Sequence, residues 1–142
     1  DFGLRPGNWR VWLIHLGAAM LISLPILYLG TRFASLDAYY ALDDFSLFIY
    51  GLETAAYMLG WEFFCRGYLL FGLRQKFGEL SILIQLVPFV LLHLGKPEIE
   101  TLSTIATGII FGYMAYRGNS FWPAFLLHVF INLVFRVMVN YL

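Results

Sequence analysis

The sequence has little charge and almost no cysteine, and both shortages restrict what the protein can be. Only 13% of its 142 residues are Asp, Glu, Lys or Arg, whereas a soluble domain averages about 25%. Nine basic residues are balanced by nine acidic ones, so the charge balance gives no indication of a nucleic-acid partner. The single cysteine, Cys65, excludes an intramolecular disulfide and a metal site built from several cysteines.

What the sequence has in abundance is apolar and aromatic side chains. Hydrophobic residues make up 61% of the chain, aromatic residues 19%, and the mean hydropathy is +0.75. Aromatic side chains gather at membrane interfaces and between packed helices. We therefore expect one integral-membrane domain over residues 1–142, embedded in a lipid bilayer. The chain does not begin with Met, so we expect it to be a piece of a longer protein.

Long apolar stretches divide the chain into membrane-sized segments. A bilayer core of about 30 Å needs about 20 apolar helical residues. Counted this way, the sequence predicts an all-α, polytopic helical membrane bundle of about five transmembrane helices. The expected helices are residues 9–29, 45–73, 80–94, 101–116 and 121–142. A polar link over residues 34–44 ends in Asp43 and Asp44, either of which could cap the second helix.

The distribution of basic residues predicts an orientation. Short cytoplasmic loops carry an excess of Lys and Arg. If successive helices alternate in direction, most basic residues lie on the side of the N-terminus, which we therefore expect to be cytoplasmic. This group comprises Arg5, Arg10, Arg74, Lys76 and Arg117, while Arg32 and Lys96 lie on the other side.

An acid and a base interrupt the second apolar segment. Glu62 and Arg66 are four residues apart, so they share one face of a helix in the order that favours pairing. Ionisable residues at membrane depth are costly and usually face a bundle interior or a water-filled cavity. The pair is either part of a functional site or a structural tie between helices. Cys65 beside it is interpreted as a small packing residue rather than a nucleophile.

Two further segments carry polar residues with the same spacing. His93 lies four residues after Phe89, and His128 lies four residues before Asn132. At about 1.5 Å per residue, Glu62, His93 and His128 lie roughly 17, 20 and 12 Å from the expected cytoplasmic ends of their helices. Three helices thus bring polar groups to one middle layer. On the last helix, His128, Asn132 and Arg136 follow one another at every fourth position and form a polar stripe. Arg136 is either a structural partner or a side chain reaching outward.

This set of side chains suits hydrolysis inside a membrane. A carboxylate can take a proton from water, while imidazole and amide groups hold the water or stabilise an oxyanion. Alternatively, Glu62, His93 and His128 could hold a catalytic zinc with an open position. The sequence leaves both mechanisms open, and no cofactor is needed for the first. The turn over residues 95–100 is expected to line a wet cavity, with its Lys96, Glu98 and Glu100 as rim residues or simply as a solvated loop.

Three motifs in this order resemble the CPBP family of intramembrane proteases, which groups CAAX prenyl endopeptidases with bacteriocin-processing and immunity proteins (the Abi family). They read E-x-x-x-R-G from Glu62, F-x-x-x-H to His93, and H-x-x-x-N from His128, within a motif-bearing core of about residues 46–132. The resemblance implies an endopeptidase that cleaves a membrane-anchored peptide or protein near its end. It also implies residue roles: Glu62 activates water, His93, His128 and Asn132 support water and oxyanion, and Arg66 orients the first motif.

Some bacterial relatives, the myxosortase-like enzymes, process C-terminal sorting tails, and we accordingly expect location in a bacterial inner membrane. The chain departs from the family at Trp61, where the fuller motif has a first glutamate credited as the base. Either Glu62 acts from a shifted geometry, or Glu100 lends a carboxylate, or the chain is a poor or inactive protease. The alternative functions are a non-catalytic membrane-binding or bacteriocin-immunity protein and, with less support, a small transporter.

Overall fold

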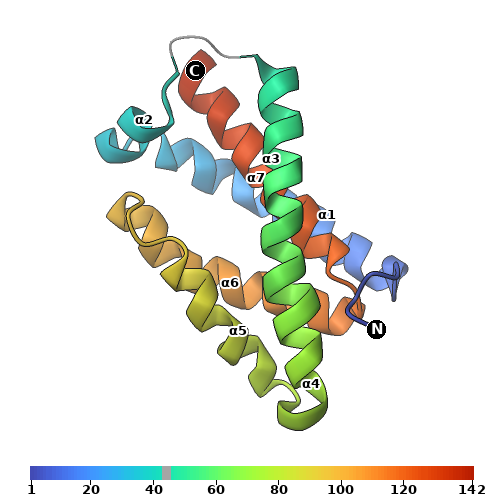
Figure 1. Cartoon of the computed structure of the whole chain (residues 1–142). Helices are drawn as coiled ribbons and strands as arrows, with labels where there is room; N and C mark the ends of the chain where they lie inside the picture. The colour runs from blue at the N-terminus through green and yellow to red at the C-terminus, as the bar shows by residue number, and fades with distance from the viewer. Residues whose placement is uncertain (43–45) are drawn as a thin grey trace.

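The computed structural model describes residues 1–42 and 46–142, and this part of the chain is helical without strands (Figure 1). The prediction that Asp43 or Asp44 caps the second helix lies outside the described residues. Among the described ones, Ser46 occupies the N-cap position, without a side-chain capping hydrogen bond. The elements are α1 (Trp9–Gly30), α2 (Ala34–Tyr40), α3 (Leu47–Glu62), the π-helix η1 (Phe63–Leu70), α4 (Phe71–Phe77), α5 (Leu80–Leu91), α6 (Glu98–Gly118) and α7 (Trp122–Tyr141).

The all-helical prediction is confirmed, but the expected count of about five membrane spans is not. Within the described residues, α1 and α7 are long and apolar enough to cross a membrane. The second expected span is divided, because the π-helix η1 separates α3 from α4 along one continuous rod (Figure 1). The third, α5, has only 12 residues.

Two parts of the chain differ from the sequence prediction in their local structure. The expected polar link contains the short helix α2. The expected loop at residues 95–100 is shorter than predicted, because α6 already begins at Glu98 with Pro97 at its N-cap. Glu98 and Glu100 therefore lie in the first turn of α6, where negative charge is favourable beside the exposed backbone N–H groups.

Close packing of α5 against α6 fixes the layer that contains the candidate site. A Cβ atom added to Gly108 would lie 2.4 Å from Leu86 Cδ1, and one added to Gly112 would lie 2.8 Å from Gln85 Nε2. Small residues at such positions let two membrane helices approach closely. Cys65 is fully buried in the same core, as expected of a packing residue.

The N-terminal segment is fastened to the junction of α6 and α7. The N–H of Phe121 donates to the carbonyl of Gly3 at 3.0 Å, and the N–H of Asn8 donates to the carbonyl of Gly118 at 2.7 Å. At the same end of the bundle, Arg74 at the C-terminal part of α4 donates to the side chain of Asn119 at 2.6 Å. These contacts bring together the chain segments that carry the basic residues assigned to one side. That this side is cytoplasmic stays a prediction.

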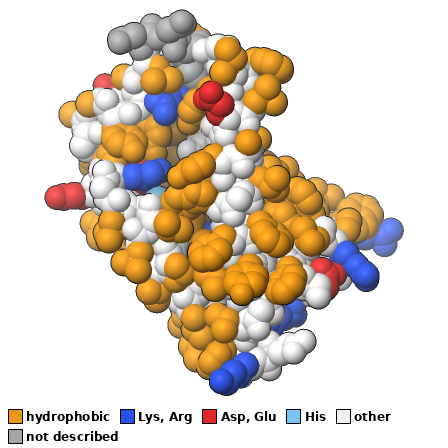
Figure 2. Space-filling view, in the orientation of Figure 1, with side chains coloured by type: hydrophobic (Ala, Val, Ile, Leu, Met, Phe, Trp, Pro, Cys, Tyr) orange, Lys and Arg blue, Asp and Glu red, His pale blue; other side chains and the backbone are white. Residues whose placement is uncertain are grey.

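The surface is unusually apolar. Hydrophobic side chains cover much of the face in Figure 2, and charged side chains are scattered mainly near its edges. Large apolar residues such as Ile14 and Phe48 are each 75% exposed. An apolar surface of this extent marks contact with lipid or with other proteins.

Candidate active site

Glu62 and Arg66 form a completely buried ion pair where α3 passes into η1. Both side chains have 0% exposure, and Arg66 Nη1 donates to Glu62 Oε1 at 3.1 Å. The guanidinium lies over the ring of Phe89, 3.9 Å from its centroid, and its Nη2 donates to the carbonyl of Gly108 at 3.4 Å. A buried pair is stable only when such further contacts compensate for lost hydration. Arg66 is therefore sealed between α5 and α6.

His128 on α7 is the second partner of Glu62. Its Nδ1 lies 2.6 Å from Glu62 Oε1, and because an ionised carboxylate only accepts hydrogen bonds, Nδ1 carries the hydrogen. In the neutral ring, Nε2 is then an acceptor. Glu62 itself is not among the residues that line the cavity described below, whereas His128 is. That Glu62 activates water stays a prediction; in the structure its carboxylate is bonded to Arg66 and His128.

His93, just beyond the end of α5, lies next to His128. The two imidazoles are nearly parallel, with 6.3 Å between centroids and 16° between planes. His93 Nδ1 lies 2.8 Å from the carbonyl of Phe89. A carbonyl can only accept, so Nδ1 carries the hydrogen here as well and Nε2 of the neutral ring is an acceptor. Trp61 packs its ring edge-on against His93 at 5.3 Å.

The polar stripe of α7 serves two purposes. Asn132 lines the cavity and donates one amide hydrogen to the carbonyl of His128 at 2.9 Å, which leaves its other hydrogen and its oxygen available. One turn later, Arg136 donates to the carbonyl of Tyr40, and Asn140 accepts from the N–H of Leu42 at 2.9 Å. Arg136 thus holds the end of α2 and does not reach outward.

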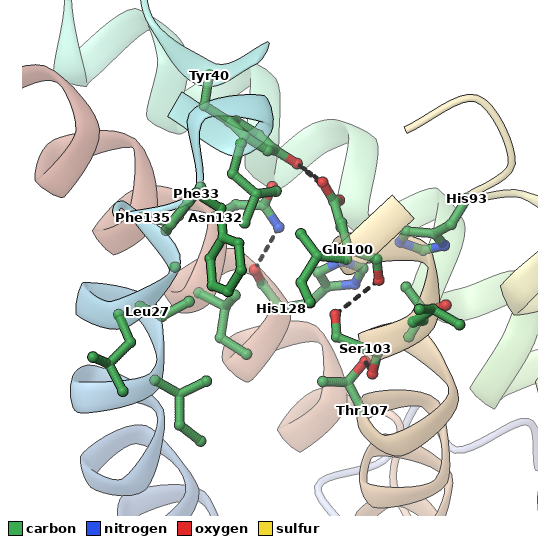
Figure 3. Close-up of a pocket in the computed structure, with 18 of the residues that line it drawn as sticks. Leu27, Phe33, Tyr40, His93, Glu100, Ser103, Thr107, His128, Asn132 and Phe135 are labelled. Atoms are coloured by element: carbon green, nitrogen blue, oxygen red, sulfur yellow. Dashed lines mark hydrogen bonds between the residues drawn. The ribbon is translucent and has the colours of Figure 1, made fainter. Parts of the chain in front are cut away.

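His93, His128 and Asn132 line one cavity of about 570 Å³. Figure 3 shows its walls: Leu27 of α1, Phe33 before α2, Tyr40 of α2, the α6 residues Glu100, Ser103 and Thr107, and the α7 residues His128, Asn132 and Phe135, with His93 beside α6. Most of the lining is apolar, and the polar groups gather where α5, α6 and α7 meet.

Glu100 is held on the wall of this cavity by two partners. The hydroxyl oxygen of Tyr40 lies 2.8 Å from both carboxylate oxygens, which share its one hydrogen, and Lys96 Nζ donates to Oε1 at 2.7 Å. Tyr40 lies in α2, outside the two candidate spans; burial raises the pKa of its hydroxyl, and the negative charge of Glu100 raises it further. Tyr40 is therefore a neutral phenol that donates to Glu100. The sequence suggested Glu100 as a rim residue but gave no signal for Tyr40.

The zinc interpretation does not fit the geometry. A catalytic zinc is bound by three protein ligands and a water, and the residues that the structure describes contain no cluster of three or more His, Cys, Asp or Glu suited to a metal. Glu62 Oε1 is already shared between Arg66 and the Nδ1 of His128. Glu62 Oε2 has no hydrogen-bond partner among the described residues, but together with the Nε2 atoms of the two histidines it does not form such a cluster, so no step below uses a metal.

Comparison with known families matches this chain to one family. The family described as type II CAAX prenyl endopeptidase Rce1-like matches residues 45–134, most of the chain. The chain belongs to this family. The match extends from the start of the α3 rod to α7 and includes all five predicted site residues. The family is one of CAAX proteases embedded in membranes, so the resemblance noted from the motifs is confirmed. No curated protein and no solved structure is significantly similar to the chain.

Proposed function

We propose that the protein is an intramembrane endopeptidase that cleaves a membrane-anchored peptide or protein near its C-terminal end. The observation that carries the proposal is the pair of parallel imidazoles, His93 and His128, on the wall of one largely apolar cavity. Each ring is oriented through Nδ1, by a backbone carbonyl in one case and by the buried Glu62 in the other. Fixed imidazoles at a membrane-embedded cavity suit the handling of a single water.

In this proposal the polar side chains divide the work of hydrolysis. His93 accepts a hydrogen bond from the attacking water at Nε2 and orients it. His128 and the free amide hydrogen of Asn132 face the carbonyl oxygen of the scissile bond; on protonation, His128 donates from Nε2 and its charge is balanced by Glu62. Arg66 keeps Glu62 ionised and in place. The roles of Glu62 and Arg66 are therefore indirect, through His128.

The apolar walls suggest what the substrate carries. The lining includes apolar side chains from three helices, Leu27 of α1, Leu102 of α6 and Phe135 of α7. These walls suit an apolar anchor, and the name of the family points to prenylated peptides of the CAAX type. A C-terminal apolar tail is the other class that such a cavity accommodates.

The proposal is tested with purified protein reconstituted in proteoliposomes. The probes are a farnesylated peptide ending in a CAAX sequence and a peptide with an apolar C-terminal tail, and the products are read by mass spectrometry. We expect one defined cleavage, lost in His93→Ala and in His128→Ala. His15→Ala is the matched control, because His15 makes the same bond to a carbonyl four residues earlier but is exposed on α1. Failure of the protein to cleave either probe would contradict the proposal.

One observation favours a second candidate, a non-catalytic binding or immunity protein that keeps the cavity. Trp61 stands where the family motif has its first glutamate and packs on His93. If this ring prevents catalysis, Trp61→Glu creates cleavage that the parent lacks, and Glu62→Gln leaves the biological phenotype intact. If the protein is an enzyme as it stands, the parent cleaves the probes and Glu62→Gln reduces the rate.

A further inference from the structure

The cavity wall has one acidic side chain among the residues that the structure describes, and it is Glu100 rather than Glu62. Glu100 is mostly buried, with 17% side-chain exposure. Its Oε1 receives both Lys96 and Tyr40, while its Oε2 receives only Tyr40. A carboxylate has about four acceptor sites, so Oε2 keeps one available. This carboxylate is firmly held but not saturated.

Backbone contacts of the turn between α5 and α6 connect the segment that carries Glu100 to His93. The hydroxyl of Thr101, the next residue, donates to the carbonyl of His93 at 2.9 Å, and the N–H of Lys96 donates to the same carbonyl at 3.2 Å. The backbone at His93 thus anchors both sides of the short segment that carries Glu100. A group fixed in this way can be aligned with the water that His93 orients, without a cost for ordering at the moment of reaction.

Position 61 presents no carboxylate to His93. Trp61 packs its ring against His93 there, and Glu62 is fully buried and bonded to Nδ1 of His128. Among the described residues, the acidic side chain that shares the cavity lining with His93 is therefore Glu100. We propose that Glu100 is the catalytic base of this protein, in place of a carboxylate at position 61; the inference rests on the proposed endopeptidase function.

The reaction balances with this residue alone as proton carrier. The carboxylate of Glu100 takes one proton from water while the water oxygen bonds to the scissile carbonyl carbon, and the carbonyl electron pair moves to oxygen. His128, protonated at Nε2 with its charge balanced by Glu62, and Asn132 donate hydrogen bonds to that oxyanion, and His128 keeps its proton throughout. When the oxyanion collapses, the C–N bond breaks and the carboxylic acid of Glu100 gives its proton to the leaving amine. The products are a new carboxyl terminus and a free amine, and Glu100 is again a carboxylate.

The competing explanation is that Glu100 only ties α2 across the cavity through Tyr40. Glu100→Gln separates the two roles, because the amide oxygen still accepts from Tyr40 and Lys96 but cannot take a proton. We expect kcat on the cleaved probe to fall by about 10²–10⁴-fold, the usual contribution of a positioned base, with KM within a few-fold of the parent. Glu98→Gln is the matched control: this residue lies in the same first turn, is exposed and is not part of the lining.

Chemical rescue of kcat distinguishes a catalytic carboxylate from a purely structural contact. Glu100→Ala leaves space for a small acid at the wall, so sodium formate should restore part of the lost kcat in a concentration-dependent way. Sodium chloride at equal ionic strength should have no effect. Should either substitution fail to fold, as seen in thermal unfolding, Glu100→Asp retains the tie and moves the carboxylate back by one methylene. A folded Asp variant with reduced kcat supports the proposal, and one with parental kcat overturns it.

The outcomes distinguish the role of Glu100 from the proposed endopeptidase function on which it rests. A parent that cleaves neither probe overturns both. A parent that cleaves and depends on His93 and His128, while a folded Glu100→Gln cleaves at the parental rate, overturns the role of Glu100 alone. Loss of kcat in Glu100→Gln without rescue of the folded Glu100→Ala by formate also overturns it, because the defect then does not arise from a missing carboxylate.

Discussion

Glu62 and Glu100 are each paired with a cation four residues away, and their surroundings differ completely. Glu62 and Arg66 both have 0% exposure, and the guanidinium is stacked between aromatic rings. Glu100 and Lys96 have 17% and 24% side-chain exposure, and Glu100 lies on the cavity wall. The same sequence spacing therefore produces a sealed structural support in one place and an accessible acid in the other. Burial, rather than spacing, indicates which carboxylate can meet a substrate.

The largest effect is expected when the cation of the buried Glu62–Arg66 pair is removed. Arg66→Met leaves Glu62 charged and without its main compensation, and removal of one partner from a buried pair costs about 3–5 kcal/mol of unfolding free energy. We expect cleavage to be lost as well, because Glu62 then no longer holds His128 in place. The measurement is denaturant unfolding in mixed micelles, combined with the cleavage assay.

The double variant Glu62→Met/Arg66→Met provides the control for that prediction. With both charges gone, no ion stays buried, and stability should return most of the way to that of the parent. Cleavage should stay lost, since His128 still lacks its partner at Nδ1. If the double variant is as unstable as Arg66→Met, the single loss reflects missing packing around Phe89 rather than an uncompensated charge.

A smaller effect is expected where the sealed pair meets the backbone of α6. In Gly108→Ala the new methyl group would lie 2.4 Å from Leu86 Cδ1 and 2.8 Å from Phe89 Cδ1, so Phe89, on which Arg66 stacks, must shift. Overpacking of this kind costs about 1–3 kcal/mol. Gly72→Ala in α4 is the control, because its new methyl group meets nothing within 4 Å, and such a change stabilises by about 0.4–1 kcal/mol. Equal stabilities for both variants would contradict close packing at Gly108.

The sequence identified the large features because they depend on hydropathy and motif spacing. The long apolar helices α1 and α7 and the convergence of Glu62 with His128 follow from apolar runs and i to i+4 spacing. The π-helix η1 could not be anticipated, since residues 63–70 read as an ordinary apolar helix and the shift from i−4 to i−5 hydrogen bonds is set by packing. It changes how residues beyond Glu62 face their neighbours.

The position of Glu62 relative to the cavity could not be predicted from the sequence either. Whether a carboxylate faces a cavity or a neighbouring ring depends on which helix approaches it, and only the packing of α7 shows that His128 lies between Glu62 and the space. The contact between Tyr40 and Glu100 spans 60 positions of the chain, and no local pattern predicts it. The polar link carries no recognisable helix signal, because α2 has only seven residues.

The smallest effect is expected at the accessible pair, and it completes the comparison. Lys96→Met removes the ammonium group beside Glu100, but partly solvated ion pairs are worth less than about 1 kcal/mol. The unfolding free energy should change by no more than that, and kcat by less than about tenfold, because Tyr40 still holds the carboxylate. Lys76→Met, at an exposed position in α4, controls for the loss of a positive charge. A loss of several kcal/mol in Lys96→Met would mean that the pair is a structural support like Glu62 and Arg66. Glu100 would then stabilise the cavity wall rather than serve as a catalytic group.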